Sequence, residues 1–305
     1  MTSRIDRLIA LRSFPPHADL SLEEVEALVP LTVERSFAAG ATVMPEGEHV
    51  TEVFFVVRGR VKLTHGGKSF NEFGPHSIIG GLAAIAGDPE GYGCVALEDT
   101  TVLALPSEVL LESMEEHFDR VRPLIATLAT QILKIRRRLG PAAGFERSEW
   151  QPAGAPPAPL NLIERLSLLR GAIPFGGSRL EALTDLAKDV REVRFSADQL
   201  LWQESDEADD TLFIVWGAVR AKNKEGLELR FGPGDIVGFL SAFGESGRWF
   251  EARAETELVA LQLTPDMLID IFQDHSELAV AMIRSMAGGL LALIKKELSL
   301  ANDAP

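Results

Sequence analysis

The chain contains an internal repeat, and this repeat limits its possible folds more than any other feature. Residues 73–80 read FGPHSIIG and residues 231–238 read FGPGDIVG, so the second copy follows the first by 158 residues (238 − 80). The same shift, without a gap, aligns further identical residues: Arg7 with Arg165, Leu8 with Leu166, Gly59 with Gly217, Leu103 with Leu261 and His117 with His275. A repeat that needs no gap over nearly the whole chain predicts two copies of one folding unit.

The stretch between the two copies is rich in proline, alanine and glycine. Residues 154–159 read GAPPAP. Proline fixes φ and lacks an N–H donor, so this segment favours extended structure and is typical of a semi-rigid spacer. A chain of 305 residues has room for two domains that each bury a core. We expect a first domain over residues 1–140, a linker over 141–159 and a second domain over 160–305.

Both copies show the same order of elements. A short helical start precedes short runs of β-branched and aromatic residues, among them residues 53–57 and 101–105 in the first copy and 212–216 and 258–263 in the second. Short strands separated by glycines predict an antiparallel β-roll or jelly roll. Each copy then ends in a long helix with apolar residues three or four apart: Leu124, Leu128, Ile132, Ile135 and Leu139, and then Met282, Met286, Leu290 and Leu293.

The expected fold class is therefore α+β. It comprises two tandem antiparallel β-roll domains of the double-stranded jelly-roll type, each with short N-terminal helices and a long C-terminal helix.

Charge and composition restrict the partners and the compartment. The chain has 30 basic and 45 acidic residues, a net charge of −15, which repels phosphate backbones and anionic lipid. Its single cysteine, Cys94, cannot form an intramolecular disulfide and is typical of a reducing compartment. The N-terminus lacks the apolar core of a signal peptide, and no uninterrupted apolar run is long enough to span a bilayer. We expect a cytoplasmic protein without a membrane partner.

Several motifs add to this pattern. Residues 37–48 read FAAGATVMPEGE, which fits an F-x-x-G…G-[DE] motif, and Gly59 lies between two consecutive predicted strands. With the order of elements, these residues resemble the cyclic-nucleotide-binding domain of the catabolite-activator family and of protein kinase A regulatory subunits. The resemblance covers both copies. It implies a phosphate-binding cassette that runs G-E-L, then an arginine followed by small residues. Its glutamate accepts the ribose 2′-hydroxyl, and its arginine pairs with the cyclic phosphate.

The second copy keeps part of this cassette, since residues 238–250 read GFLSAFGESGRWF. The resemblance implies that Arg248 is the phosphate arginine, while Phe239 replaces the glutamate and two bulky aromatic residues replace the small ones. The candidate ligand residues are Gly238, Phe239, Leu240, Ser241, Arg248, Trp249 and Phe250. An alternative interpretation makes Arg248 a surface arginine that pairs with Glu245 or Glu251.

The first copy carries a degenerate equivalent of this site. It comprises Gly80, Gly81, Leu82, Glu90 and Gly91. The cassette glutamate is missing, and the repeat places Glu90 where the arginine belongs, so a carboxylate there repels phosphate. If the chain binds a nucleotide, we expect the second copy to bind it.

Other classes of function find little support in the sequence. The histidines show no ligand spacing with each other or with cysteine, and no serine lies in a nucleophile motif, so we expect no metal site, no cofactor and no catalysis. The basic run at residues 134–138 complements the dipole at the end of a helix. Only a short tail follows the second long helix, which leaves no room for a DNA-binding module, so we expect no direct DNA binding. The acidic residues around Asp209 and Asp210 are interpreted as a solvated loop.

Two hypotheses about function remain open. The first is a regulatory sensor, whose second domain binds a cyclic nucleotide such as cAMP or another small anion and signals through its long helix to an unknown protein partner. The second is a scaffold that binds a partner without any ligand. The two long helices are expected to pair, either within one chain as an internal pseudo-dimer or between chains as a homodimer.

Overall fold

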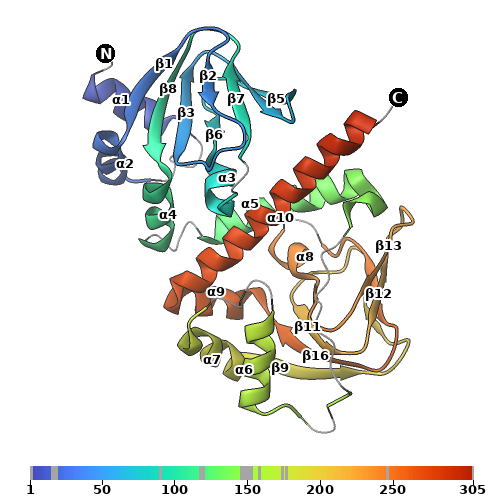
Figure 1. Ribbon diagram of the computed structural model, residues 1–305. Helices are drawn as coiled ribbons and strands as arrows, with labels where there is room; N and C mark the ends of the chain where they lie inside the picture. Colours follow the sequence, from blue (N-terminus) through green and yellow to red (C-terminus); the bar gives the residue numbers. More distant parts are fainter. Residues whose placement is uncertain are drawn as a thin grey trace. The chain divides into compact units, whose positions relative to one another are not determined.

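The computed structural model describes residues 3–14, 20–88, 91–116, 121–144, 154–156, 159–172, 175, 178–244 and 247–303, except for the side chains of 113–116 and 301–303. The chain divides into two compact units. Residues 1–116 and 298–305 form unit 1, and residues 117–297 form unit 2. Each unit contains one β roll with helices around it (Figure 1).

Over its described residues up to 116, unit 1 has two short helices and a 3₁₀ turn, then the strands of its roll, and then helix α4. The elements are α1 (Arg4–Arg12), α2 (Leu22–Leu28), η2 (Val29–Leu31), β1 (Val33–Phe37), β2 (Thr42–Met44), β3 (Glu52–Arg58), β4 (Val61–His65), β5 (Lys68–Phe73), β6 (Ile78–Ile79), α3 (Gly81–Ala86), β7 (Gly93–Ala96), β8 (Thr100–Pro106) and α4 (Ser107–Glu116).

Unit 2 begins with a long helix and then repeats the same order. The elements are α5 (Val121–Leu139), η4 (Gly140–Ala143), α6 (Leu162–Gly171), α7 (Leu180–Asp189), β9 (Arg191–Phe195), β10 (Leu200–Trp202), β11 (Thr211–Trp216), β12 (Val219–Lys222), β13 (Glu228–Phe231), β14 (Ile236–Val237), α8 (Phe239–Phe243), β15 (Glu251–Ala254), β16 (Leu258–Leu263), α9 (Pro265–Asp274) and α10 (Ser276–Asp303).

The two rolls share one topology and one register. The sheets of unit 1 have the orders β1-β8-β3-β6 and β2-β7-β4-β5, and those of unit 2 have the orders β9-β16-β11-β14 and β10-β15-β12-β13, with antiparallel pairing throughout. Val33 lies opposite Ala104 and Arg191 lies opposite Gln262, which preserves the offset of 158 residues. The equivalent pairs β2–β7 and β10–β15 also share a bulge. The predicted fold class of two tandem antiparallel rolls is confirmed.

Helices α1 and α6, which are repeat equivalents, both begin with a capping box, although the residues that form it differ. In α1, the Ser3 side chain accepts from the Asp6 backbone while the Asp6 carboxylate accepts from the Ser3 backbone. In α6, Asn161 and Glu164 form the same capping box. Such boxes satisfy backbone donors that a helix leaves unpaired at its start, so each helix begins at a fixed residue.

Helix α5 follows the first roll in the sequence but belongs to unit 2. It packs against α8, and its residue Leu133, 3% exposed, is part of the hydrophobic core of the second roll. Leu128, Ile132 and Ile135 of the predicted apolar stripe are also buried. This structural division therefore differs from the repeat boundary at residue 140. The amphipathic pattern predicted the apolar face of α5, and the structure shows which roll that face covers.

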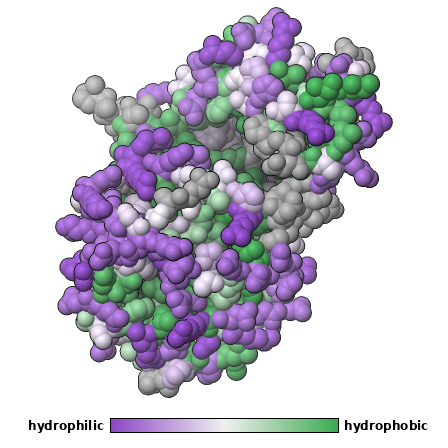
Figure 2. Space-filling view, turned by 180° about the vertical axis from the view of Figure 1, so that it is seen from behind, coloured by the Kyte–Doolittle hydropathy of each residue, from purple (hydrophilic) through white to green (hydrophobic). Residues whose placement is uncertain are grey.

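Among the described residues, α10 is also long and apolar enough, by length and composition, to cross a membrane, with a mean hydropathy of 1.7. Leu278 and Ile283 on this helix are buried. So are all four residues of the predicted stripe, Met282, Met286, Leu290 and Leu293. Packing of these side chains accounts for the apolar composition. On the face shown in Figure 2, hydrophilic residues predominate and hydrophobic ones gather in smaller areas between them.

The turn between β11 and β12 depends on a glycine. Gly217 has φ +89°, a left-handed conformation, and a Cβ atom there would lie 2.1 Å from the Glu257 carbonyl oxygen. Its repeat counterpart Gly59 has φ +91°, and a Cβ atom there would lie 2.5 Å from the Thr100 Oγ1 atom. Only glycine meets both demands, the positive φ and the close approach of a neighbouring strand.

Gly217→Ala is expected to destabilise unit 2 by about 3 kcal/mol, because the methyl group adds a steric clash to the cost of a positive φ. Gly226→Ala is the matched control, since Gly226 has φ +83° and open space around its Cα. It should cost about 1 kcal/mol. Urea unfolding can be followed by tryptophan fluorescence, since all four tryptophans, Trp150, Trp202, Trp216 and Trp249, fall within unit 2. Equal losses in the two variants would contradict the packing argument.

Leu133→Ala tests the placement of α5. Because Leu133 is buried in the core of the second roll, its truncation should lower the free energy of unfolding reported by the tryptophans by about 3 kcal/mol. The neighbouring exposed Lys134 provides the control, and Lys134→Ala should change this value by less than about 0.5 kcal/mol. An unchanged unfolding curve for Leu133→Ala would show that α5 does not stabilise unit 2.

Candidate functional site

The structure brings the start of α8 and Arg248 together in the second roll. Gly238 precedes α8 with φ +90°, and a Cβ atom at this position would lie 2.5 Å from the Arg248 Nη1 atom. The same point lies 3.3 Å from the Asp210 carbonyl oxygen and from the Trp202 ring. The absence of a side chain at Gly238 therefore makes room for the guanidinium group.

Arg248 is buried, at 3% exposure, so the interpretation of a surface arginine is wrong. Its Nη1 donates to the Asp210 carbonyl oxygen at 2.8 Å, and its Nη2 donates to the Asp210 carboxylate. The guanidinium carbon lies 4.0 Å from the centre of the Trp202 ring, a cation–π contact. Of the two alternative partners, Glu251 pairs with Arg253 at 2.7 Å, and Glu245 lies outside the described residues.

Further hydrogen bonds hold this ion pair in place. Gln262 Nε2 donates to the second carboxylate oxygen of Asp210 at 2.5 Å. The backbone of Arg248 exchanges hydrogen bonds with the loop after β10, since its N–H donates to the Asp206 carbonyl at 2.8 Å and its carbonyl accepts from the Ser205 N–H at 2.7 Å. Among the described residues, the Arg248 Nε atom has no partner, so one buried donor remains unused.

The acidic loop is only partly solvated. Asp209 has an 82% exposed side chain, as the sequence analysis expected, whereas the side chain of Asp210 is 21% exposed and pairs with Arg248. The expectation of a solvated loop is therefore wrong for Asp210. Asp210, Trp202 and Gln262 were not predicted from the sequence as neighbours of Arg248. One signal was available, because the repeat aligns Asp210 with another acidic residue, Glu52.

The remaining candidate residues point in different directions. Trp249 and Phe250 are buried in the core of the second roll, where the Trp202 indole N–H donates to the Phe250 carbonyl at 3.1 Å. Phe239 is half-buried on α8, and its ring lies 4.7 Å from that of Phe243. Ser241 is buried, and Leu240 packs against the core of the roll. The structure thus groups Gly238 with Arg248, while Trp249 and Phe250 fill the interior of the roll.

The equivalent place in the first roll has the same backbone with different side chains. Gly80 has φ +86°, and a Cβ atom there would lie 3.0 Å from the Glu52 carbonyl oxygen and 3.7 Å from the Met44 sulfur. Met44 and Glu52 therefore stand where the second roll has Trp202 and Asp210. The Glu52 carboxylate pairs with Arg35 at 2.6 Å. Gly81 and Leu82 are half-buried in α3, and Glu90 lies outside the described residues.

The strand that follows this place is closely packed. Gly91 is buried, and a Cβ atom there would lie 2.2 Å from the Glu48 carbonyl oxygen. Tyr92 is buried too, and burial together with the negative charge of Asp88 raises the pKa of its hydroxyl. Cys94 on β7 is fully buried, and burial raises the pKa of its thiol to about 12.

Two other groups of polar residues have structural roles. Glu46 accepts from the Thr64 hydroxyl at 3.2 Å and from the Gly66 backbone, and its repeat counterpart Glu204 accepts from the Lys224 backbone at 2.8 Å. His275 lies 3.1 Å from the Asp185 carboxylate; its counterpart His117 lies outside the described residues. In the described part of the chain, no three histidine, cysteine or acidic residues gather as metal ligands.

A match to a protein-family model shows to which family the chain belongs. The model of the cyclic nucleotide-binding domain matches residues 34–117 and 192–275, two stretches separated by the same offset of 158 residues (192 − 34). The chain belongs to this family. Residues 80–92 lie within the first matched stretch and residues 238–250 within the second.

Relatives of known name match only parts of the chain. The Pycsar effector protein XpPycTIR of Xanthomonas perforans is 29% identical over 111 residues, which cover 36% of this chain and 37% of that protein. The CRP-like cAMP-activated global transcriptional regulator of Mycobacterium tuberculosis is 27% identical over 118 residues, 37% of this chain and 53% of the regulator. The chain thus spans about a third to a half of the lengths of these relatives.

Solved structures with tandem domains match over nearly the full length at low identity. Those compared include cAMP-bound PfPKA-R, at 13% identity with coverage of 98% of this chain and 91% of that chain and a TM-score of 0.37. The regulatory domain of Toxoplasma gondii PKA with cAMP is 14% identical, covers 97% of both chains and has a TM-score of 0.34.

Cys94 provides a test of the packing around the first cassette. With its pKa raised to about 12, the thiol stays protonated at pH 8, and its burial also blocks reagents. Ellman's reagent should therefore modify the native chain at least about a hundred-fold more slowly than the urea-unfolded chain. Because Cys94 is the only cysteine, the signal from the unfolded chain corresponds to one thiol per molecule and calibrates the assay. Rapid labelling of the native chain would show that β7 opens readily.

Proposed function

We propose that this protein is a regulatory sensor of the cyclic-nucleotide-binding type, and that its second domain holds the ligand site. The observation that carries the proposal is the position of Arg248. Its guanidinium group lies against Gly238 at the start of α8, and its anion is the carboxylate of Asp210. A buried cation at the cassette position is the group that recognises a phosphate in this family, and Asp210 takes the place of that phosphate.

In this proposal the Asp210 carboxylate competes with the ligand phosphate for Arg248. A carboxylate and a phosphate make the same kind of charge-assisted hydrogen bonds to a guanidinium group. A cyclic nucleotide must therefore displace Asp210 from Arg248 before its phosphate binds. Phe239 offers no carboxylate to the ribose 2′-hydroxyl, so the ligand also loses that contact. We expect weaker binding than an open site with both groups would give.

The packing of unit 2 offers a route for the signal. Helix α8 packs against α5, and a Cβ atom at Gly244 would lie 3.4 Å from the Leu133 Cδ1 atom. At its other end α5 is tied to α10, because Arg138 Nε and Nη2 donate to the two carboxylate oxygens of Glu297 at 2.7 and 2.8 Å. A shift of α8 on ligand binding is therefore passed to both long helices. We propose that these helices form the internal pair and present the signal to a protein partner.

A second candidate function is the ligand-free scaffold. The observation that favours it is the burial of the site, since Arg248 is 3% exposed, Trp249 5% and Phe250 3%. In this alternative the Arg248–Asp210 pair is a structural contact, and the protein binds its partner through surfaces alone. Both candidates place the protein in the cytoplasm, without catalysis and without direct DNA binding.

Binding of cAMP and cGMP to the full chain, measured by calorimetry, separates the two candidates. Asp210→Asn removes the competing charge, so affinity should rise about ten-fold or more, because hydrogen bonds to charged groups are typically worth about 1.5–3 kcal/mol. Arg248→Gln should abolish binding in either background. The matched control is Glu52→Gln, which makes the same change at the repeat-equivalent position of the first roll and should leave affinity unchanged.

Two outcomes would overturn the sensor. If folded Asp210→Asn binds neither nucleotide at millimolar concentration, the scaffold is the better account. If Arg248→Gln binds as well as the unchanged chain, the ligand site lies elsewhere.

A further inference from the structure

Two adjacent glycines, Gly288 and Gly289, lie in the interior of α10. Residues 276–287 precede them in the helix, and residues 290–303 follow them. Apart from proline, glycine is the least favourable residue in the interior of a helix, because it loses the most backbone freedom when the helix forms. Two glycines in a row therefore weaken α10 at this point, unless packing requires them.

Packing requires neither glycine in the described part of the chain. A Cβ atom at Gly288 or Gly289 would have no heavy atom within 4 Å outside the adjacent helix backbone, and neither residue has a positive φ. Alanine therefore fits both positions without strain. The repeat aligns them with Thr130 and Gln131 of α5, so the glycines are not part of the pattern that the two copies share.

The half of α10 before the glycines is held firmly in unit 2. Leu278 and Ile283 on this half are fully buried. His275, which directly precedes the helix, lies 3.1 Å from the Asp185 carboxylate on α7, and its backbone carbonyl accepts from the Leu278 N–H at 3.0 Å. The start of α10 is thus fixed both by the core and by α7.

The half after the glycines is attached to a different element. Leu290 and Leu293 are buried on this half, and Glu297 accepts from Arg138 of α5 at 2.7 and 2.8 Å. The side chains of this ion pair are 62% exposed for Arg138 and 33% for Glu297, and ion pairs at the surface contribute little to stability. The weakest point of the helix therefore lies between a firmly held half and a half that a surface contact ties to α5.

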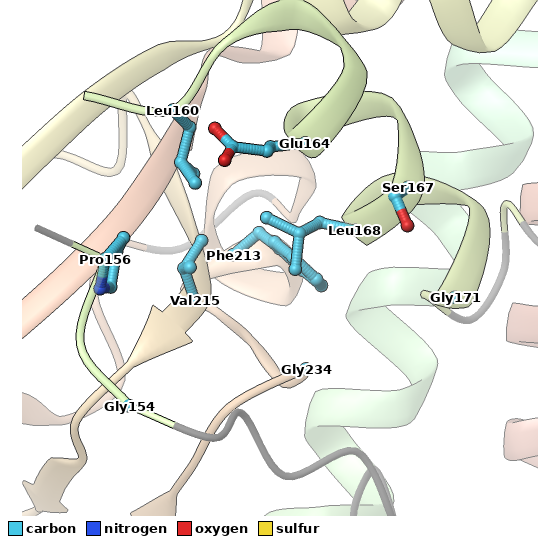
Figure 3. Close-up of a pocket in the computed structure, with 10 residues that line it drawn as sticks. All are labelled: Gly154, Pro156, Leu160, Glu164, Ser167, Leu168, Gly171, Phe213, Val215 and Gly234. Carbon is cyan, nitrogen blue, oxygen red and sulfur yellow. The ribbon is translucent and has the colours of Figure 1, made fainter. Parts of the chain in front are cut away.

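The linker before α6, in contrast, is held against unit 2. Gly154 and Pro156 of the linker and the following Leu160 line a groove of about 320 Å³ beside α6 (Figure 3). Arg194 donates to the Pro156 carbonyl at 3.2 Å from both Nη atoms, and Arg165 Nε donates to the Leu160 carbonyl at 3.1 Å. The segment expected to act as a spacer is thus held in place, whereas the helix expected to be continuous contains a weak point.

We infer that α10 exchanges between the straight helix of the structure and a form that is bent at Gly288 and Gly289. The first half stays packed in unit 2, and the second half follows α5. In the proposed function, a shift of α8 reaches α5 through their packing, and the bend lets the end of α10 move while its start stays fixed. That role rests on the proposed function. The bend itself is a property of the ligand-free chain and is tested without a nucleotide.

Pulsed electron–electron double resonance on the full chain measures the bend. Spin labels are attached through Arg284→Cys and Leu300→Cys, two exposed positions on either side of the glycines. The background is Cys94→Ala, which installs the residue of the second copy, Ala252. In a straight helix the two labelled backbone positions lie about 24 Å apart, at a rise of about 1.5 Å per residue. We expect a second, shorter distance beside this one.

Replacing both glycines by alanine should lower the population of the shorter distance at least about ten-fold, because alanine favours the helix. Gly171→Ala is the matched control. Gly171 is the last residue of α6 and also has open space around its Cα, so the distances should not change. Arg138→Gln removes the tie to Glu297 and should raise the population of the shorter distance about two-fold.

Three results would overturn the inference. The first is a single narrow distance at the straight-helix value in the chain with both glycines. The second is a shorter distance that persists in the alanine variant, because the motion then arises elsewhere. The third is a dimer, detected by sedimentation, that dissociates on alanine substitution, since the glycines would then serve a contact between chains. Both substitutions favour the helix, so failure to fold does not complicate the result.

Discussion

The Arg248–Asp210 ion pair joins parts of the second roll that lie far apart in the sequence. Through this pair and its neighbours, the cassette is linked to Trp202 on β10, to the start of β11 and to Gln262 on β16. Burying a charge is costly unless it is paired, so removal of either partner leaves an uncompensated charge in the roll. The pair thus holds Arg248 against Gly238, and in the proposed sensor it occupies the cation that a phosphate would bind.

The repeat explains why so much of the fold was predictable from the sequence. A gap-free offset requires the same backbone in both copies, and the positive φ of Gly80 and Gly238 and the shared bulges follow from it. The candidate role of Arg248 came instead from the resemblance to the family, since the repeat places Glu90 at the equivalent position. The partner of Arg248 was not predictable, because Asp210 lies 38 residues away in sequence beside an exposed acidic neighbour. Nothing in a run of acidic residues shows which carboxylate turns inward.

The position of α5 could not be predicted for a different physical reason. An apolar stripe shows that one face of a helix is buried, but it does not show against which element. The repeat placed α5 at the end of the first expected domain, residues 1–140. Instead, Leu133 of α5 enters the core of the second roll, beside the helix that begins at Gly238. The differences between the copies, such as Trp202 for Met44 and Asp210 for Glu52, are therefore as informative as the identities, since equivalent positions make different contacts.

A site in which Asp210 already pairs with Arg248 responds to a ligand differently from a site in which Arg248 is unpaired. If the internal pair is favoured by about 2 kcal/mol, the binding-competent state makes up roughly 3% of the molecules, and the apparent affinity falls about thirty-fold. The same competition is what allows binding to produce a signal. A ligand shifts an equilibrium only between states that it binds differently, here the state with the ion pair formed and the state with it open. Opening the Arg248–Asp210 pair changes the packing beside Gly238 and α8, which contacts α5. In the proposed sensor, the carboxylate that weakens binding is thus the same group that makes binding detectable at the long helices.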